Sequence, residues 1–93
     1  MDKEKVLSND FKVCRKIYEY SKVRSEKIWF SKLVEAMSGE LSPSTISKCV
    51  DRLFDLGMID GDWEKADGRW TRTFNITGEA EGFVKSLYDV TSA

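Results

Sequence analysis

The spacing of apolar residues predicts two helices in the first forty positions. Apolar side chains recur at three- and four-residue steps over about 9–23, which is the period of a helix with one buried face. The residues on that face are Phe11, Cys14, Ile17 and Tyr18. Ser8 or Asn9 can cap the start of this helix. A second run with the same period covers about 30–38 and ends at Gly39, because glycine suits the left-handed position after a helix.

The pattern also predicts a very short strand between these two helices and a third helix after them. Ile28 and Trp29, between the first two helices, are expected to form the strand. Ser42 is a good N-cap, and Pro43 suits the first helical position, where its missing amide hydrogen costs nothing. Gly57 is expected to close this helix. Its buried stripe is predicted to contain Ile46, Cys49, Val50, Leu53 and Phe54.

A β-hairpin follows, because Asp67-Gly68 is a strong signal for a two-residue turn between strands. Placing the turn there fixes which residues face one another and puts the apolar ones on one face. Shifting the register by one residue would scatter them. The predicted pairs are Ile59 with Ile76, Gly61 with Phe74, Trp63 with Arg72, and Lys65 with Trp70.

A last helix over about 78–90 completes the chain, with Thr77 as its cap. Its apolar stripe is Ala80, Phe83, Val84, Leu87 and Tyr88. The order of elements, α-β-α-α-β-β-α, is that of a winged helix-turn-helix, a mainly helical fold with a small hairpin wing. We expect one domain over 1–93, with the helix-turn-helix at about 30–57 and the wing at about 58–76.

The composition argues against a metal site, a cofactor and an enzyme. The chain contains no histidine, and its two cysteines, Cys14 and Cys49, are far apart in sequence. A structural zinc site and the usual catalytic triads therefore lack their ligands and bases. We interpret both cysteines as small buried hydrophobes, in preference to redox sensors.

Hydropathy indicates the cellular compartment, and the charge distribution indicates whether nucleic acid can be the binding partner. No apolar run approaches the twenty residues of a membrane span and no secretory signal is present, so a cytoplasmic protein is expected. The net charge of −1 is unusual for a nucleic-acid binder. It divides unevenly, because residues 1–48 carry ten Lys/Arg and seven Asp/Glu, whereas residues 49–93 carry five and nine. The local field where phosphates bind matters more than this total.

The third helix is the candidate recognition helix. The connection at 38–41 is short and contains glycine, as a helix-turn-helix requires. The outward side of the third helix carries hydroxyls and cations that suit phosphates or base edges. A solvated polar face is the plain alternative. The candidate DNA-binding residues there are Ser42, Ser44, Thr45, Ser47, Lys48 and Arg52.

At this point the chain resembles the winged-helix transcription regulators of the MarR, ArsR and PadR type. The stretch SPSTISKCVDRLFDLGMI at 42–59 is similar to their recognition helix and its passage into the wing. Asp67-Gly68-Arg69 resembles the MarR-type wing tip, and Ile76-Thr77 the exit into the next helix. The resemblance implies that the chain binds duplex DNA, with Arg69 in the minor groove and Arg72 as a second candidate. Packing of Arg72 over Trp63 is the alternative role for that residue.

Some features depart from these families. Gly78 directly follows the strand-ending Thr77, the cysteine pair and histidines of ArsR-type metal sensing are missing, and the chain is too short for the extra dimerisation helices of MarR proteins. The wing is acidic, and in the predicted register Asp60, Asp62 and Glu64 share one face, which should point away from phosphate. This acidity favours the alternative function, a protein-interaction module within a larger assembly.

A small domain buries little surface, so a homodimer is expected. We expect the first and last helices to form the subunit contact through Phe11, Tyr18, Phe83, Leu87 and Tyr88. No motif indicates a small-molecule effector. Of the tryptophans, Trp29 is expected to pack where the short strand meets the second helix, and Trp63 on the inner face of the hairpin, whereas Trp70 can be either packed or exposed.

Overall fold

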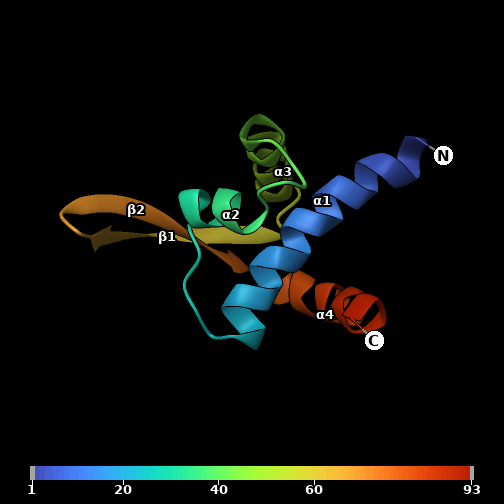
Figure 1. Cartoon of the computed structure of the whole chain (residues 1–93). Helices are drawn as coiled ribbons and strands as arrows, with labels where there is room; N and C mark the ends of the chain where they lie inside the picture. Colours follow the sequence, from blue (N-terminus) through green and yellow to red (C-terminus); the bar gives the residue numbers. More distant parts are fainter. Residues whose placement is uncertain (1, 93) are drawn as a thin grey trace.

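The computed structural model describes residues 2–92, with side chains described for 9–65 and 67–91. Its elements follow the order of a winged helix, which confirms the predicted fold class (Figure 1). They are α1 (Asp2–Tyr18), η1 (Glu19–Val23), α2 (Phe30–Ala36), α3 (Pro43–Asp55), β1 (Ile59–Ala66), β2 (Arg69–Ile76) and α4 (Gly78–Ser92). The expected short strand is a single bridge between Trp29 and Thr73.

The ends of the first two helices differ from the prediction. The α1 backbone is helical from Asp2, so Ser8 and Asn9 lie inside the helix and the predicted cap was wrong. The lysines and glutamates that precede Ser8 are good helix formers, which agrees with this earlier start. At its other end α1 passes into one turn of π-helix, η1. The second helix, α2, ends at Ala36, two residues earlier than predicted.

The predicted caps of the last two helices are confirmed. The Ser42 hydroxyl accepts a hydrogen bond from the Thr45 amide at 3.3 Å, and Pro43 lies in the first turn of α3. At the start of α4, the Thr77 hydroxyl accepts from the Ala80 amide at 3.3 Å and donates to the Gly57 carbonyl at 2.8 Å. Thr77 thus caps one helix and joins it to the end of another.

The hairpin has the predicted register. Ile59 pairs with Ile76, and the pairing continues without a bulge to Ala66 and Arg69. Asp67 and Gly68 have φ angles of 52° and 78°, the left-handed values that a type I′ turn needs at both central positions. The two eight-residue strands project well beyond the helical body (Figure 1).

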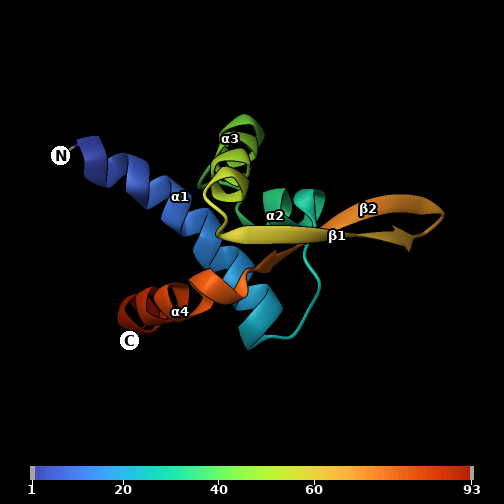
Figure 2. The ribbon, with the colours of Figure 1, turned by 180° about the vertical axis from the view of Figure 1, so that it is seen from behind.

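The core lies where α1, α3, α4 and the base of the hairpin meet. α1 and α4 lie side by side at the end opposite the wing in both views (Figures 1 and 2). Cys14 and Cys49 are both buried and unbridged, as expected. The fully buried side chains include Val13, Ile17, Ile28, Leu33, Met37, Ile46, Leu53, Ile59 and Val84.

Neither a membrane-spanning helix nor a metal-binding cluster is found in the described part of the chain. None of the helices within residues 2–92 combines the length and apolarity that a bilayer span needs. Among the side chains described, no group of three or more cysteines and carboxylates lies close enough to hold a metal ion.

Candidate nucleic-acid interface

The outer face of α3 is open at its N-terminal half. Ser44, Ser47 and Lys48 are exposed there. Two of the other predicted contacts are partly used by the helix itself: the Ser42 hydroxyl lies 3.0 Å from the Thr45 hydroxyl and 3.3 Å from that of Ser44. Ser47 and Lys48 are therefore the side chains of this face that are most available to a ligand, and Ser44 is exposed beside them.

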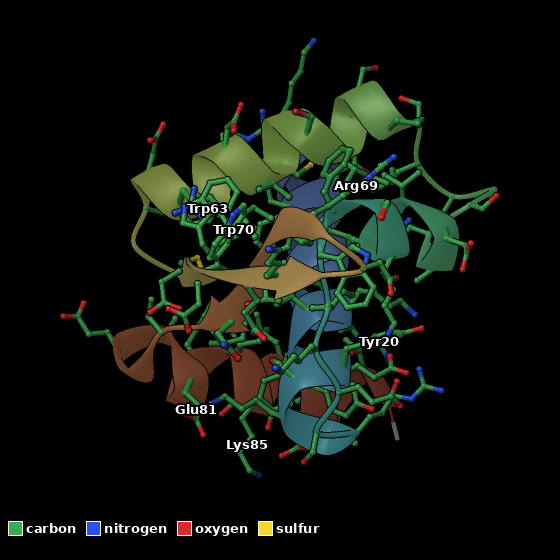
Figure 3. The ribbon with its side chains drawn as sticks, turned by 90° about the vertical axis from the view of Figure 1, so that its left-hand side faces the viewer. Tyr20, Trp63, Arg69, Trp70, Glu81 and Lys85 are labelled. Carbon is green, nitrogen blue, oxygen red and sulfur yellow. The ribbon has the colours of Figure 1, made fainter. Side chains whose placement is uncertain are left out.

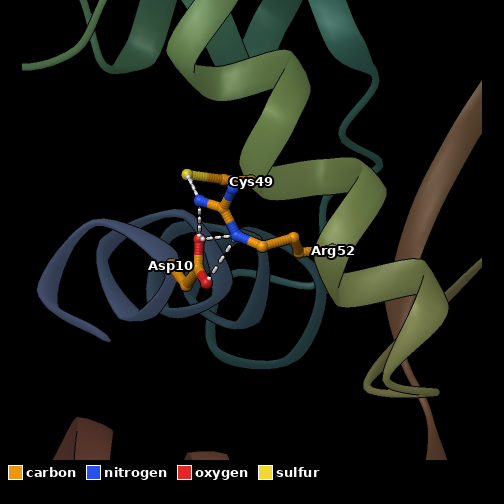
Figure 4. Close-up of polar contacts among 3 residues, drawn as sticks. All are labelled: Asp10, Cys49 and Arg52. Carbon is orange, nitrogen blue, oxygen red and sulfur yellow. Dashed lines mark hydrogen bonds and ion pairs between the residues drawn. The ribbon is translucent and has the colours of Figure 1, made fainter. Parts of the chain in front are cut away.

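Arg52, another predicted contact, is held by α1 (Figure 4). Its guanidinium donates to both carboxylate oxygens of Asp10, at 2.7 and 3.0 Å, and also lies 3.6 Å from the Cys49 sulfur. Burial alone would raise the pKa of Asp10, but the hydrogen bonds from Arg52 and Cys49 and the Arg52 charge outweigh it, so this pKa lies below its ordinary value. Arg52 thus joins the candidate recognition helix to α1.

The sequence reasoning missed Asp10, although a signal was present. Asp10 lies three and four positions before Val13 and Cys14, so it falls on the buried side of α1. A carboxylate on a buried stripe requires a partner, because an unpaired buried charge is costly. The candidate partners were the cations on the outward face of the third helix, and Arg52 is the one that binds Asp10.

One face of the hairpin is turned toward α3. The Phe74 ring packs edge-on against Phe54 of α3, with 5.9 Å between ring centroids. The Arg72 guanidinium lies over the same Phe54 ring at 4.2 Å, and 6.0 Å from the Trp63 ring. The predicted cation-π contact of Arg72 with Trp63 is therefore present, and a closer one with α3 accompanies it.

Gly61 makes the space that Arg72 uses. A Cβ atom at this position would lie 2.8 Å from Arg72 Nε and 2.7 Å from the Thr73 carbonyl oxygen, closer than van der Waals contact allows. The absence of a side chain at Gly61 therefore lets Arg72 lie across the strand toward Phe54.

The opposite hairpin face is acidic and turned away from α3. Asp62 and Glu64 alternate with the α3-facing residues of β1. Glu64 forms an ion pair with Lys27, in the loop that passes on the far side of the hairpin from α3 (Figure 1), and lies near the hydroxyl of the buried Thr73. The hydrogen bond from Lys27 lowers the pKa of Glu64. Arg69, at the wing tip, shares this face by register and is exposed.

The tryptophans divide between body and wing. Trp29 is half-buried at the N-cap of α2, as predicted, with Lys32 Nζ 5.0 Å from its ring. Trp63 and Trp70 are 64% and 67% exposed, so the expected packing of Trp63 was wrong. Both indoles lie on the α3 side of the hairpin (Figure 3), in the outer half of the strands, toward the turn.

The predicted dimer residues also divide. Tyr18 is only 6% exposed and packs against Tyr88 of its own chain, with 5.3 Å between ring centroids, so it belongs to the core. Phe11, Leu87 and Tyr88 are half-buried. Phe83 is 61% exposed on α4, and Val90, two helical turns further, is 76% exposed.

Comparison with known proteins shows the fold. No family model and no curated protein matches the sequence. Among solved structures, the chain is similar to the circadian clock associated protein Pex from Anabaena (19% identity, TM-score 0.69, covering 88% of this chain and 75% of Pex). It is also similar to a PadR-like transcriptional regulator from Bacillus cereus (16% identity, TM-score 0.66, covering 89% and 82%).

A third similar structure is ZitR from Lactococcus lactis, with 17% identity and a TM-score of 0.74 over 96% of this chain. The chain spans 61% of the length of ZitR. The chain therefore has the winged helix-turn-helix fold found in PadR-like transcription regulators.

Proposed function

We propose that this chain is a DNA-binding transcription regulator, with α3 in the major groove of duplex DNA and the hairpin at the adjacent minor groove or backbone. The observation that carries the proposal is the separation of charge on the hairpin. Lys65 and Arg72 lie on the face turned toward α3, and Asp62 and Glu64 on the other. A duplex seated on α3 would meet the cationic face, so the net negative charge of the chain does not oppose binding.

The residues have different roles in this proposal. Ser44, Ser47 and Lys48 contact base edges or phosphates. Of the amides near Ser44 and Thr45, that of Thr45 already donates to the Ser42 hydroxyl, so the Ser44 amide is the one that suits a phosphate oxygen. Arg52 holds α3 on α1 through Asp10, and it binds a phosphate only if its guanidinium donates to the phosphate and to Asp10 at once. Arg72 supplies a wing contact from the face turned toward α3. Arg69 lies on the reverse face by register, so it supplies its contact from the tip of the hairpin, beside the turn.

We further propose that the protein acts in the cytoplasm as a homodimer. The exposed stripe on α4, Phe83 and Val90 with the half-buried Leu87 and Tyr88, supports a subunit contact through α4. Phe11 of α1, which is also half-buried, belongs to the same proposed contact. Two copies would read half-sites about one helical turn, roughly 34–36 Å, apart.

Gel-shift titration of genomic DNA fragments at two salt concentrations tests the DNA proposal. We expect Lys48→Ala to weaken binding similarly for all fragments and to lower the slope of log K against log salt by about 1. Lys85→Ala is the matched control, because Lys85 lies on α4 at the far side from α3 (Figure 3). No retarded species, or equal effects of the two variants, would refute the proposal.

A protein-interaction module within a larger assembly is the second candidate, favoured by the excess of acidic residues in 49–93. Sedimentation of the chain with and without duplex DNA separates the two, because it reports subunit number and DNA binding together. A chain that sediments identically with and without DNA favours the module.

A further inference from the structure

The outer half of the hairpin presents aromatic rings and cations alternately. Trp63 is paired with Arg72, and the next pair on the same face is Lys65 with Trp70. All four side chains are exposed. We call these four residues the wing face. Because cross-strand pairs are about 5 Å apart, each indole has a cation beside it on the partner strand.

The wing face is held in place although it lies outside the body. Arg72 is fixed between the Phe54 and Trp63 rings, in the space left by Gly61. Both indoles are rigid and apolar, and the two side chains remain 64% and 67% exposed. Exposed aromatic clusters of this kind mark contact surfaces in soluble proteins.

Charge and ring chemistry together indicate the ligand. The strand residues on this face include two cations and no carboxylate, while the acidic residues lie on the reverse face, so the ligand is an anion. Indole rings add a preference for flat, apolar groups. Nucleic acid combines phosphates with planar bases, and base stacking on aromatic side chains is the usual mode of single-strand binding.

The spacing of the two tryptophan positions distinguishes between paired and unpaired bases. Trp63 and Trp70 are diagonal neighbours on the two strands, and such neighbours are about 7–8 Å apart. Successive bases in a B-form strand are about 3.4 Å apart and hide their faces in the stack. Bases that occupy both indoles must therefore be unstacked, which a single strand allows and an intact duplex does not.

We propose that the wing face binds single-stranded nucleic acid, with bases stacked on Trp63 and Trp70 and phosphates on Lys65 and Arg72. The site shares Lys65 and Arg72 with the proposed wing contact to a duplex, but the duplex proposal does not use the two indoles, and it depends on Lys48 of α3, which the wing face does not contain. The two activities can therefore succeed or fail independently.

Fluorescence anisotropy with a labelled oligothymidylate of about ten nucleotides tests the proposal on the full chain. We expect Trp63→Ala and Trp70→Ala each to weaken binding about tenfold or more, and Trp70→Phe to retain most of it. Val23→Ala, which removes an exposed apolar side chain from η1, should leave binding unchanged. Lys48→Ala should leave single-strand binding intact while it weakens duplex binding, if α3 reads duplex DNA.

Four results would overturn the proposal. Equal binding of an abasic oligomer of the same length would show attraction to phosphates alone. An equal loss of duplex binding in both tryptophan variants would assign the wing face to the duplex site. Binding of a polyglutamate peptide through the same tryptophans would indicate a protein partner. A change of sedimentation in the tryptophan variants without nucleic acid would indicate a second copy of the chain.

Discussion

The base and the tip of the hairpin share two strands and one register but have opposite environments. At the base, Ile59 and Ile76 face one another and are buried in the core. Four positions further along β1, Trp63 lies on the same face of the hairpin and is mostly exposed. Register decides the face on which a side chain lies, whereas burial depends on how far the helical body extends beneath it.

Two ion pairs repeat this contrast between body and wing. Asp10, bound by Arg52 between α1 and α3, has a side chain that is 14% exposed. Glu64, bound by Lys27 beside the hairpin, has one that is 35% exposed. Both carboxylates have lowered pKa values, but water screens the second pair more strongly.

The largest expected effect on stability comes from shortening a buried side chain at the base of the hairpin. Ile59→Ala should lower the free energy of unfolding by about 2–5 kcal/mol, because it leaves a cavity in the core. Trp70→Ala, which removes more atoms from the tip, should change it by less than about 0.5 kcal/mol. Urea denaturation measures both. Similar losses of unfolding free energy in the two variants would show that the tip is packed in solution, and the contrast between base and tip would then be wrong.

The boundary between base and tip is sensitive to a single methyl group. Gly61→Ala should destabilise the fold by about 1–3 kcal/mol, because its Cβ overlaps Arg72 and the Thr73 carbonyl. Gly82→Ala is the matched control: nothing lies within 4 Å of its Cβ, and alanine in a helix should stabilise by up to about 1 kcal/mol. Thermal melts of both variants check the prediction, and a Gly61→Ala protein as stable as the parent would contradict the close packing of Arg72.

The two ion pairs predict a smaller, pH-dependent effect. Because folding lowers the pKa of Asp10, this carboxylate contributes stability above its unfolded pKa of about 3.9, and the contribution is lost as pH falls through the folded value. Asp10→Asn should therefore be less stable than the parent at pH 7, with the difference shrinking in acid. Glu64→Gln should follow the same direction with a smaller change. Urea titrations between pH 7 and pH 3 measure this, and a loss in Asp10→Asn that did not vary with pH would exclude a charge effect.

The sequence by itself determined the elements and the hairpin register. Apolar periods of three and four residues located the helices, and Ser42, Pro43 and Thr77 marked helix starts. The turn at Asp67-Gly68 fixed every strand pair. These features depend on local backbone geometry and on the alternation of side chains, both of which are encoded by neighbours in the chain.

Only the tertiary structure decided which surfaces remain open. Arg52 has the sequence context of a DNA contact, yet Asp10, 42 positions away, binds it. Tyr18 was predicted from its position to lie in a subunit interface, but Tyr88 of the same chain covers it. Trp63 was predicted to pack on the inner face of the hairpin, but it is mostly exposed. Each outcome depends on the distance between elements that are remote in sequence, which local periodicity does not contain.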